Sequence, residues 1–130
     1  MPSSILFITL SGTLYALDTK TGVTAWETTI GNGRSQLCIH QNHAYVVSES
    51  QELFVVDTKT GAVIKKVPLS GLGQAPTLLI DHDQVYVTSG GVVHAFQLDG
   101  TPLWKNEFKG KGNGSINMAT DNADRQADEY

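Results

Sequence analysis

Apolar and polar positions alternate along this chain in short runs, and each run ends at a glycine or at a cluster of Asn and Asp residues. Branched and aromatic side chains dominate the runs, and the 3.6-residue period of an amphipathic helix is absent. The sequence therefore predicts an all-β fold. The expected strands are Ile5–Leu10, Thr13–Asp18, Thr24–Ile30, Ser35–His40, Ala44–Ser48, Glu52–Asp57, Ala62–Leu69, Ala75–Ile80, Gln84–Ser89, Val92–Leu98 and Pro102–Phe108.

Two short motifs recur through the chain at a nearly constant spacing. The pentapeptide Asp-Thr-Lys-Thr-Gly at residues 18–22 returns unchanged at residues 57–61, and a shortened form stands at residues 98–100. A Gly-x-Gly loop begins at Gly31, Gly71 and Gly110, so successive loops lie 40 and 39 positions apart (71−31 and 110−71). A repeat of about 40 residues that is filled with strands is the sequence pattern of a β-propeller blade.

The repeat divides residues 1–120 into blades, whose strands are named A to D from the centre outward. The first cycle begins at strand B, while the segment after the last Gly-x-Gly loop stands where a further strand A is expected. We expect that segment to supply the strand A that the first blade lacks. The expected division is residues 5–30 for strands B to D of the first blade, 35–69 for the second blade, 75–108 for the third, 115–120 for the closing strand A and 121–130 for a polar C-terminal tail.

Three blades are too few for a closed ring, because propellers typically carry four to eight. Each blade also has an apolar face that requires a neighbour. The simplest solution is a homodimer that forms one six-bladed ring, in which each C-terminal strand completes the first blade of the other copy. A nine-bladed trimer and a closed three-bladed monomer are less favoured. A piece of a longer propeller is a further alternative, against which Met1 and the polar end argue.

The segment Gly12–Gly22, with Trp26 four residues after its last glycine, resembles the PQQ-like (pyrroloquinoline-quinone-type) propeller repeat. The third cycle keeps this tryptophan as Trp104, four residues after Gly100, and the resemblance covers roughly residues 5 to 120. It implies that Trp26 and Trp104 dock blade against blade and are buried between sheets. The second cycle has Lys65 at the matching position, which leaves its outer packing open.

The functional implications of this resemblance are broad, because similar repeats occur in proteins of several kinds. They occur in quinone-dependent alcohol dehydrogenases, in outer-membrane assembly lipoproteins and in short freestanding chains. The dehydrogenases bind calcium and hold the quinone against two adjacent cysteines, whereas this chain has the single cysteine Cys38. A lipobox cysteine near the N-terminus is also absent. The resemblance to the short freestanding form implies no cofactor, and fold alone does not assign a function.

Composition excludes some partners and indicates a compartment. Thirteen acidic and nine basic residues give a net charge of −4, and no dense basic patch is present, so a nucleic-acid partner is not expected. The apolar runs are far shorter than the roughly 20 residues that span a bilayer, so no membrane partner is expected. The N-terminus lacks the basic region of a signal peptide, and a lone cysteine fits a reducing compartment. We therefore expect a cytoplasmic protein.

Catalytic and metal-binding patterns are weak. His40 and His43 flank one turn and residues 81–83 occupy the equivalent turn of the next cycle, but neighbouring blades place such turns too far apart to share an ion. The chain has no Gly-x-Ser-x-Gly motif, and no serine stands at an interpretable spacing from a histidine and a carboxylate. Cys38 has apolar neighbours and is expected to be a small buried side chain. We therefore expect no metal site and no enzyme activity.

The strongest candidate site is the mouth of the central channel, where each Gly-x-Gly loop leads into a strand A. Successive glycines can turn backbone N–H groups toward an anion, and an arginine side chain suits a carboxylate or phosphate. Alternatively, the glycines only make a tight crossing and the polar side chains hold channel water. The candidate ligand-binding residues are Arg34, Gln36, Gln74, Asn113 and Ser115.

The sequence thus predicts a non-catalytic binding or scaffolding propeller that assembles as a homo-oligomer. Its expected partners are a second copy of itself and a protein or small anionic ligand at the channel mouth. The alternative is an enzyme, or a propeller that binds a small ligand or cofactor, that uses the same channel mouth of the assembled ring.

Overall fold

The structure is a computed structural model that describes residues 4–70, 76–111, 116 and 118–121. Within these residues it contains β-strands and no helix, and the strand ends lie within two residues of the expected ends. No helix in the described part could therefore span a membrane. The strands are β1 (Ile5–Leu10), β2 (Thr13–Asp18), β3 (Thr24–Thr29), β4 (Ser35–His40), β5 (His43–Ser48), β6 (Glu52–Asp57), β7 (Val63–Pro68), β8 (Thr77–Asp81), β9 (Gln84–Ser89), β10 (Val92–Gln97) and β11 (Pro102–Asn106).

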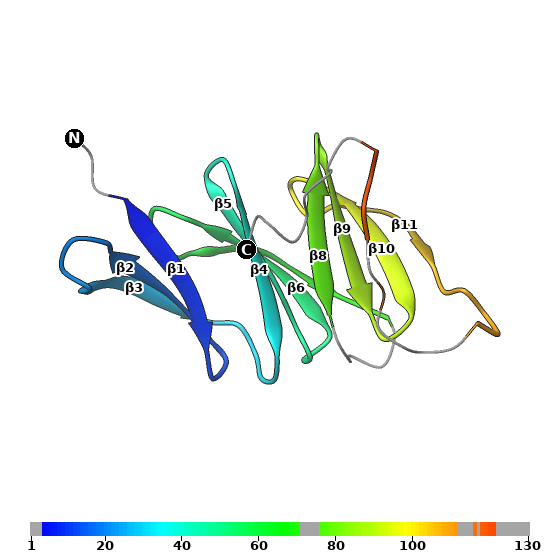
Figure 1. Cartoon of the computed structure of the whole chain (residues 1–130), viewed down its shortest axis with the longest axis horizontal. Helices are drawn as coiled ribbons and strands as arrows, with labels where there is room; N and C mark the ends of the chain where they lie inside the picture. Colours follow the sequence, from blue (N-terminus) through cyan, green and yellow to red (C-terminus); the bar gives the residue numbers. More distant parts are fainter. Residues whose placement is uncertain (1–3, 71–75, 112–115, 117, 122–130) are drawn as a thin grey trace.

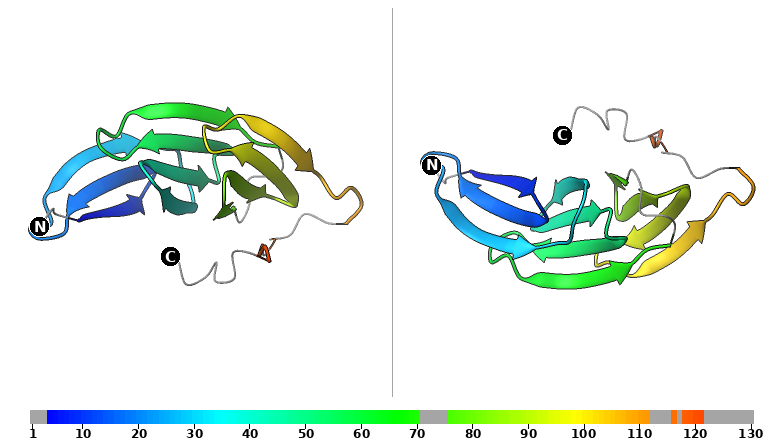
Figure 2. Two further views of the ribbon diagram at one scale, coloured as in Figure 1. Left: turned by 90° about the horizontal axis from the view of Figure 1, so that it is seen from above. Right: turned by 90° about the horizontal axis from the view of Figure 1, so that it is seen from below.

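The strands form three antiparallel sheets, which follow one another along an arc (Figure 1). Blade 1 is β1-β2-β3, blade 2 is β4-β5-β6-β7 and blade 3 is β8-β9-β10-β11. Figure 2 shows β1, β4 and β8 on the concave side of the arc and β3, β7 and β11 on the convex side. The all-β, propeller-type architecture predicted from the sequence is therefore confirmed, with three strands in blade 1 and four in each of the others.

Two kinds of turn set the strand register. Ser11 and Gly12 connect β1 to β2 with φ values of 49° and 84°, and two positive φ angles match the right-handed twist of a tight hairpin. In the pentapeptide turns, the Oδ1 atoms of Asp18 and Asp57 accept the backbone N–H groups of Lys20 and Lys59, each at 2.7 Å. The two pentapeptides therefore have the same local conformation as well as the same sequence.

The core lies between the blades. Strand β5 is buried on both faces: Ala44 and Val46 pack with blade 1, while Tyr45 and Val47 pack with blade 3. The side chains of successive residues point to opposite faces of a sheet, so a blade with two neighbours needs apolar side chains at consecutive positions. This explains why the alternation of apolar and polar residues weakens in the middle of the chain.

At each end of the arc, one sheet face has no neighbouring blade among the described residues. We call the outer face of blade 1 the leading face; it carries Leu6, Ile8, Leu10, Tyr15 and Leu17. The side chain of Leu6 is 52% exposed and that of Leu10 60%. Their register counterparts in blade 2 lie in the core between blades 1 and 2 or at its edge. Those counterparts are Ala44, Val46, Ser48, Phe54 and Val56.

The opposite end of the arc is the trailing face, which is the face of blade 3 that carries Tyr86, Val93, Ala95 and Trp104. Trp104 is 50% exposed, so its expected burial between sheets does not occur within a single chain. The reason is positional: burial of this side chain requires another blade after β11, and the described part of the chain provides none.

The predicted closing strand lies partly outside the described residues. Residues 115 and 117 are not described, and Ile116 and residues 118–120 belong to no strand. Ile116 nevertheless lies against the inner edge of blade 3, where its carbonyl oxygen accepts the Oγ1 hydroxyl of Thr77 at 3.3 Å. The pairing of this segment with another copy stays a prediction.

Candidate functional site

The junction between blades 1 and 2 is made by Trp26. Its indole Nε1 donates to the carbonyl oxygen of Thr58 at 3.1 Å, and Thr28 Oγ1 donates to the carbonyl oxygen of Gly61 at 2.5 Å. A Cβ atom at Gly61 would lie 2.6 Å from the Trp26 ring. The pentapeptide turn of blade 2 is thus a platform for the tryptophan of blade 1, and the predicted docking role of Trp26 is confirmed.

The junction between blades 2 and 3 uses different residues at the same repeat positions. Lys65 replaces the tryptophan, and its aliphatic side chain lies over Gly100. The hydroxyl of the fully buried Tyr45 donates to the carbonyl oxygen of Leu98 at 2.7 Å. Leu98 follows β10 as Thr58 follows β6, so the same backbone carbonyl is satisfied at both junctions. Burial raises the pKa of Tyr45 to about 12, which keeps the hydroxyl protonated as a donor.

This exchange of donors could have been found in the sequence. Tyr45 occupies the repeat position of Phe7, which has no hydroxyl and packs beside Trp26 with ring centroids 5.9 Å apart. The blade that loses its tryptophan therefore gains a tyrosine. That pair of changes resolves the open question of how the outer part of blade 2 packs.

A groove of about 510 Å³ runs between β1 and β4 and is lined by residues 6–9 and 35–39. Strand β1 pairs with β2 on one side, and no described strand pairs with its other edge. In blades 2 and 3 the corresponding edge is covered by the inner strands β4 and β8. The groove thus lies where an inner strand of blade 1 belongs, and it has the free backbone edge that an added strand needs.

The expected channel-mouth residues are described only in part. Arg34 and Gln36 are both exposed, Arg34 just before β4 and Gln36 within it, and Gln36 also lines the groove. Gln74, Asn113 and Ser115 lie outside the described residues. The loop before β4 already holds a carboxylate of the chain itself, since Glu49 Oε1 accepts the backbone N–H of Arg34 at 3.1 Å. An anion that used this N–H would have to displace Glu49, a residue that the sequence analysis did not single out.

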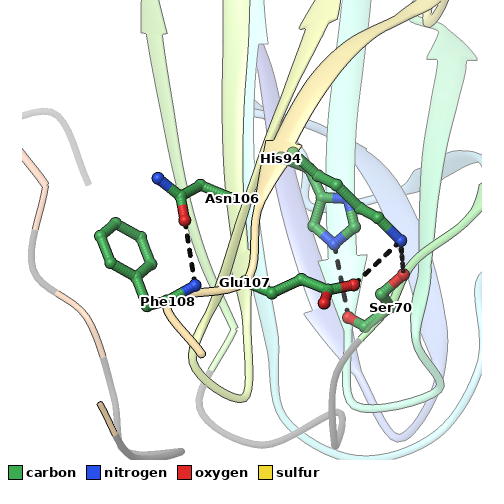
Figure 3. A network of polar contacts seen from close by, with 6 residues as sticks. Ser70, His94, Asn106, Glu107 and Phe108 are labelled. Carbon is green, nitrogen blue, oxygen red and sulfur yellow. Dashed lines mark hydrogen bonds and ion pairs between the residues drawn. The ribbon is translucent and has the colours of Figure 1, made fainter. Parts of the chain in front are cut away.

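A polar network joins the end of blade 2 to blade 3 (Figure 3). The Nε2 atom of His94 lies 3.3 Å from the carbonyl oxygen of Ser70, and Lys105 Nζ donates to Ser70 Oγ at 2.8 Å. Lys105 also pairs with Glu107 at 3.2 Å. His94 stacks on Phe96 and is buried, and this burial lowers the pKa of its imidazole.

This network does not have the chemistry of a serine nucleophile. A lysine that acts as a base must be neutral, which requires a desolvated site or a neighbouring cation. Lys105 is instead about half exposed and paired with a carboxylate, so it serves as a cationic donor to Ser70. The arrangement fixes the crossing between the two blades.

The remaining histidines lie in or beside turns. His40 and His43 face one another across the β4–β5 turn. Nδ1 of the exposed His82 lies 2.8 Å from Asp81 Oδ1, and this hydrogen bond raises the pKa of His82. Among the described residues, no group of three or more His, Cys, Asp or Glu side chains is placed to hold a metal ion. Cys38 is buried in the core between blades 2 and 3, as expected.

A protein-family model described as outer membrane protein assembly factor BamB matches residues 2–127 of the chain. Among curated proteins, none matches the chain significantly.

Solved structures with the same architecture are known. BamB from Moraxella catarrhalis is 20% identical, with a TM-score of 0.66 over 90% of this chain and 41% of that protein. A europium-containing methanol dehydrogenase is 18% identical, with a TM-score of 0.61 over 79% of this chain and 22% of that enzyme. The computationally designed Ika8 protein is 18% identical, with a TM-score of 0.68 over 85% of this chain and 35% of that chain. The chain spans less than half of each, and the likeness establishes the propeller fold.

Proposed function

The chain belongs to the family described as outer membrane protein assembly factor BamB, a family of PQQ-type β-propellers. Within this family, we propose that it is a non-catalytic binding or scaffolding propeller. We propose further that its three blades close into a six-bladed ring with a second copy. The similar proteins include an assembly factor and a dehydrogenase, so the family by itself does not separate a scaffold from an enzyme.

The observation that carries the proposal is the match between the two open faces. The leading face exposes leucines at positions whose counterparts are buried wherever a preceding blade exists. The trailing face exposes Trp104, whose counterpart Trp26 is docked where a following blade exists. Exposed apolar surface of this kind favours association, and a head-to-tail contact that is repeated twice closes a two-fold ring.

The groove between β1 and β4 supports the same assembly. Residues 115–120 of the second copy would fill it as the inner strand of blade 1. Ile116 of this segment contacts the inner strand β8 of blade 3. On blade 1, Ser35 of β4 is hydrogen-bonded to Thr9 at 2.8 Å. On blade 3, the counterpart of Thr9 is Thr88, which is hydrogen-bonded to the hydroxyl of Thr77. The same Thr77 hydroxyl donates to the carbonyl oxygen of Ile116.

The mass of the protein in solution tests the ring. Light scattering coupled to size exclusion should give about 28 kDa, twice the 14.0 kDa of one chain. Leu6→Lys on the leading face should shift the mass to that of a monomer, because a charge would enter an apolar interface. Ile64→Lys is the matched control, since Ile64 is 49% exposed but lies in the middle blade. A wild-type protein that remains at 14.0 kDa at all concentrations would contradict the ring.

Two truncations test the closing strand. Removal of residues 114–130 should abolish the dimer or cause aggregation, because β1 would keep a free edge. Removal of residues 123–130 should leave the mass unchanged. A stable dimer after the longer truncation would show that this segment does not complete blade 1.

Ligand titrations test the non-catalytic assignment. We place recognition of a protein or small anion at the mouth of the ring, where Arg34 and Gln36 lie with the expected contributions of Gln74, Asn113 and Ser115. Inorganic phosphate should bind weakly in calorimetry, and Arg34→Ala should remove that binding. Saturable binding of calcium with pyrroloquinoline quinone would instead support the cofactor-binding alternative. The expected cytoplasmic location also remains a proposal.

A further inference from the structure

The interface that closes the proposed ring has an internal template in the junction between blades 1 and 2. That junction has two parts: the Trp26 indole and the pentapeptide turn 57–61. Each part is repeated once elsewhere in the chain. The second indole is Trp104, at the trailing end, and the second pentapeptide is residues 18–22, at the leading end. Trp104 is in β11 and residues 18–22 connect β2 to β3. These strands lie at opposite ends of the row of sheets, so the indole and the turn cannot meet within one chain (Figure 1).

We propose that the Asp18–Gly22 turn of one copy is the binding site for the Trp104 side chain of a second copy. In this arrangement the Trp104 indole N–H donates to the carbonyl oxygen of Thr19, and the ring lies over Gly22. The inference rests on the proposed two-copy ring and specifies the contact that holds it.

The Asp18–Gly22 turn already has the conformation of the occupied turn. Gly22 and Gly61 have φ values of +76° and +81°. The N–H of each glycine donates to the carbonyl oxygen of the first aspartate of its turn at 2.8 Å. The N–H of the residue after each glycine donates to a threonine Oγ1 at 3.2 Å, in Thr21 and Thr60 respectively. The site therefore needs no rearrangement before an indole binds.

The two turns differ in what lies above the glycine. A Cβ atom at Gly61 would lie 2.6 Å from the ring of Trp26, whereas a Cβ atom at Gly22 would meet no described atom within 4 Å. The space that an indole fills at the internal junction is thus open at the leading end of the chain.

Trp104 has the geometry of the indole that binds this site. Trp104 pairs with Ala95 in β10 as Trp26 pairs with Ala16 in β2, so both rings project from the same side of their blades. Trp104 packs on Tyr86 with ring centroids 6.3 Å apart, as Trp26 packs on Phe7. It is nevertheless 50% exposed, and large aromatic side chains of this kind provide much of the binding energy of interfaces. A second copy of the chain supplies both a turn for Trp104 and an indole for the turn at residues 18–22.

Substitutions in the two halves test this contact through the dimer dissociation constant. Gly22→Asn keeps the turn, because asparagine tolerates positive φ, but places side-chain atoms where the indole would lie. We expect Gly22→Asn and Trp104→Ala each to raise the dissociation constant by at least about tenfold. Ile64→Asn is the control, because Ile64 is 49% exposed on β7 of the middle blade and lies outside this contact.

A mixture of the two variants tests the head-to-tail geometry. In a mixed dimer, Trp104 of the Gly22→Asn copy meets an unaltered turn on the Trp104→Ala copy, so one of the two contacts is intact. The mixture should therefore dimerise more tightly than either variant alone. If Trp104 met Trp104 and turn met turn across the two-fold axis, the mixture would show no such gain.

A spectroscopic readout separates the failure of this contact from failure of the ring. Fluorotryptophan-labelled protein should give two ¹⁹F resonances, and Trp104→Phe identifies the one from Trp104. On dimerisation, the Trp104 resonance should lose its solvent isotope shift. A 28 kDa dimer with Trp104 still solvent-exposed, or with both variants dimerising as the wild type does, would overturn the contact and leave the ring standing. A wild-type monomer at every concentration would overturn both.

Discussion

Trp26 and Trp104 occupy the same position of the repeat but have opposite surroundings. Trp26 donates to Thr58 and covers Gly61, so it joins two blades into one core. Trp104 projects from the same side of its sheet and is half exposed. The difference is the blade that follows: a repeat position sets the direction of a side chain, whereas its burial depends on the neighbour.

The two covered junctions differ in a second way. Blade 1 satisfies the carbonyl at the start of the next turn with an indole N–H, and blade 2 satisfies the equivalent carbonyl with the hydroxyl of Tyr45. Both solutions pair a partly buried carbonyl, because leaving such a group without a hydrogen-bond donor is costly. Propeller blades therefore tolerate loss of the tryptophan where another donor reaches the same atom.

The largest expected effect is that of emptying the occupied tryptophan site. Trp26→Ala should lower the free energy of unfolding by about 3 kcal/mol, because this partly buried aromatic side chain packs against the core and donates to Thr58. Trp104→Ala should lower it by less than about 1 kcal/mol in dilute monomer, because half of that side chain is already exposed. Urea denaturation at low protein concentration measures both. Equal losses would mean that the surroundings of the two rings do not differ.

A bulkier residue under Trp26 should have the next largest effect. Gly61→Asn places a Cβ atom against the Trp26 ring and should cost about 1–3 kcal/mol through overpacking. Gly22→Asn, the same change in the unoccupied turn, should cost markedly less in the monomer. The melting temperatures of the two variants at low protein concentration measure this difference. A larger drop for Gly22→Asn than for Gly61→Asn would contradict the prediction.

Removal of the Tyr45 hydroxyl tests the second junction. Tyr45→Phe leaves the carbonyl of Leu98 without its donor and should cost about 1–2 kcal/mol. The double variant Lys65→Trp with Tyr45→Phe restores the residues of the first junction and should recover part of the loss. Denaturant titration measures both steps, and the absence of any recovery would show that the two junctions are not interchangeable.

His94 should make the stability of the chain pH-dependent, unlike Phe54 at the same position of blade 2. Burial lowers the folded-state pKa of His94 below the 6.5 of an exposed histidine, while Lys105 and Glu107 act on it in opposite directions. The unfolded chain then binds a proton more readily. Stability should be full above pH 6.5 and fall as the pH drops below it. Unfolding titrations should show this slope in the wild type and not in His94→Phe; an unchanged slope would contradict it.

The smallest expected effect is that of the ion pair beside this histidine. Lys105→Met removes the contacts with Ser70 and Glu107 at a site that is about half exposed. Such pairs contribute about 0–1 kcal/mol, so the melting temperature should change little. A loss as large as that of Tyr45→Phe would place this network in the core of the junction.

The sequence pattern predicted the strands and the blade repeat, and the resemblance to the PQQ-like repeat implied the docking role of Trp26. Alternation, tight turns and the Asp-Thr-Lys-Thr-Gly motif act over a few residues, so they are readable locally. The contacts of the candidate site were harder to predict from the sequence. Arg34 and Gln36 are exposed at the start of β4, but the occupancy of the Arg34 N–H by Glu49 depends on a contact across fifteen residues.

Only the tertiary structure decided which faces are covered. It placed Tyr45 under the carbonyl of Leu98, left Leu6 and Trp104 exposed at opposite ends of the arc, and opened the groove beside β1. Each of these facts depends on which blade stands next to which. That information lies in contacts between distant parts of the chain, because the local pattern is nearly the same in every blade.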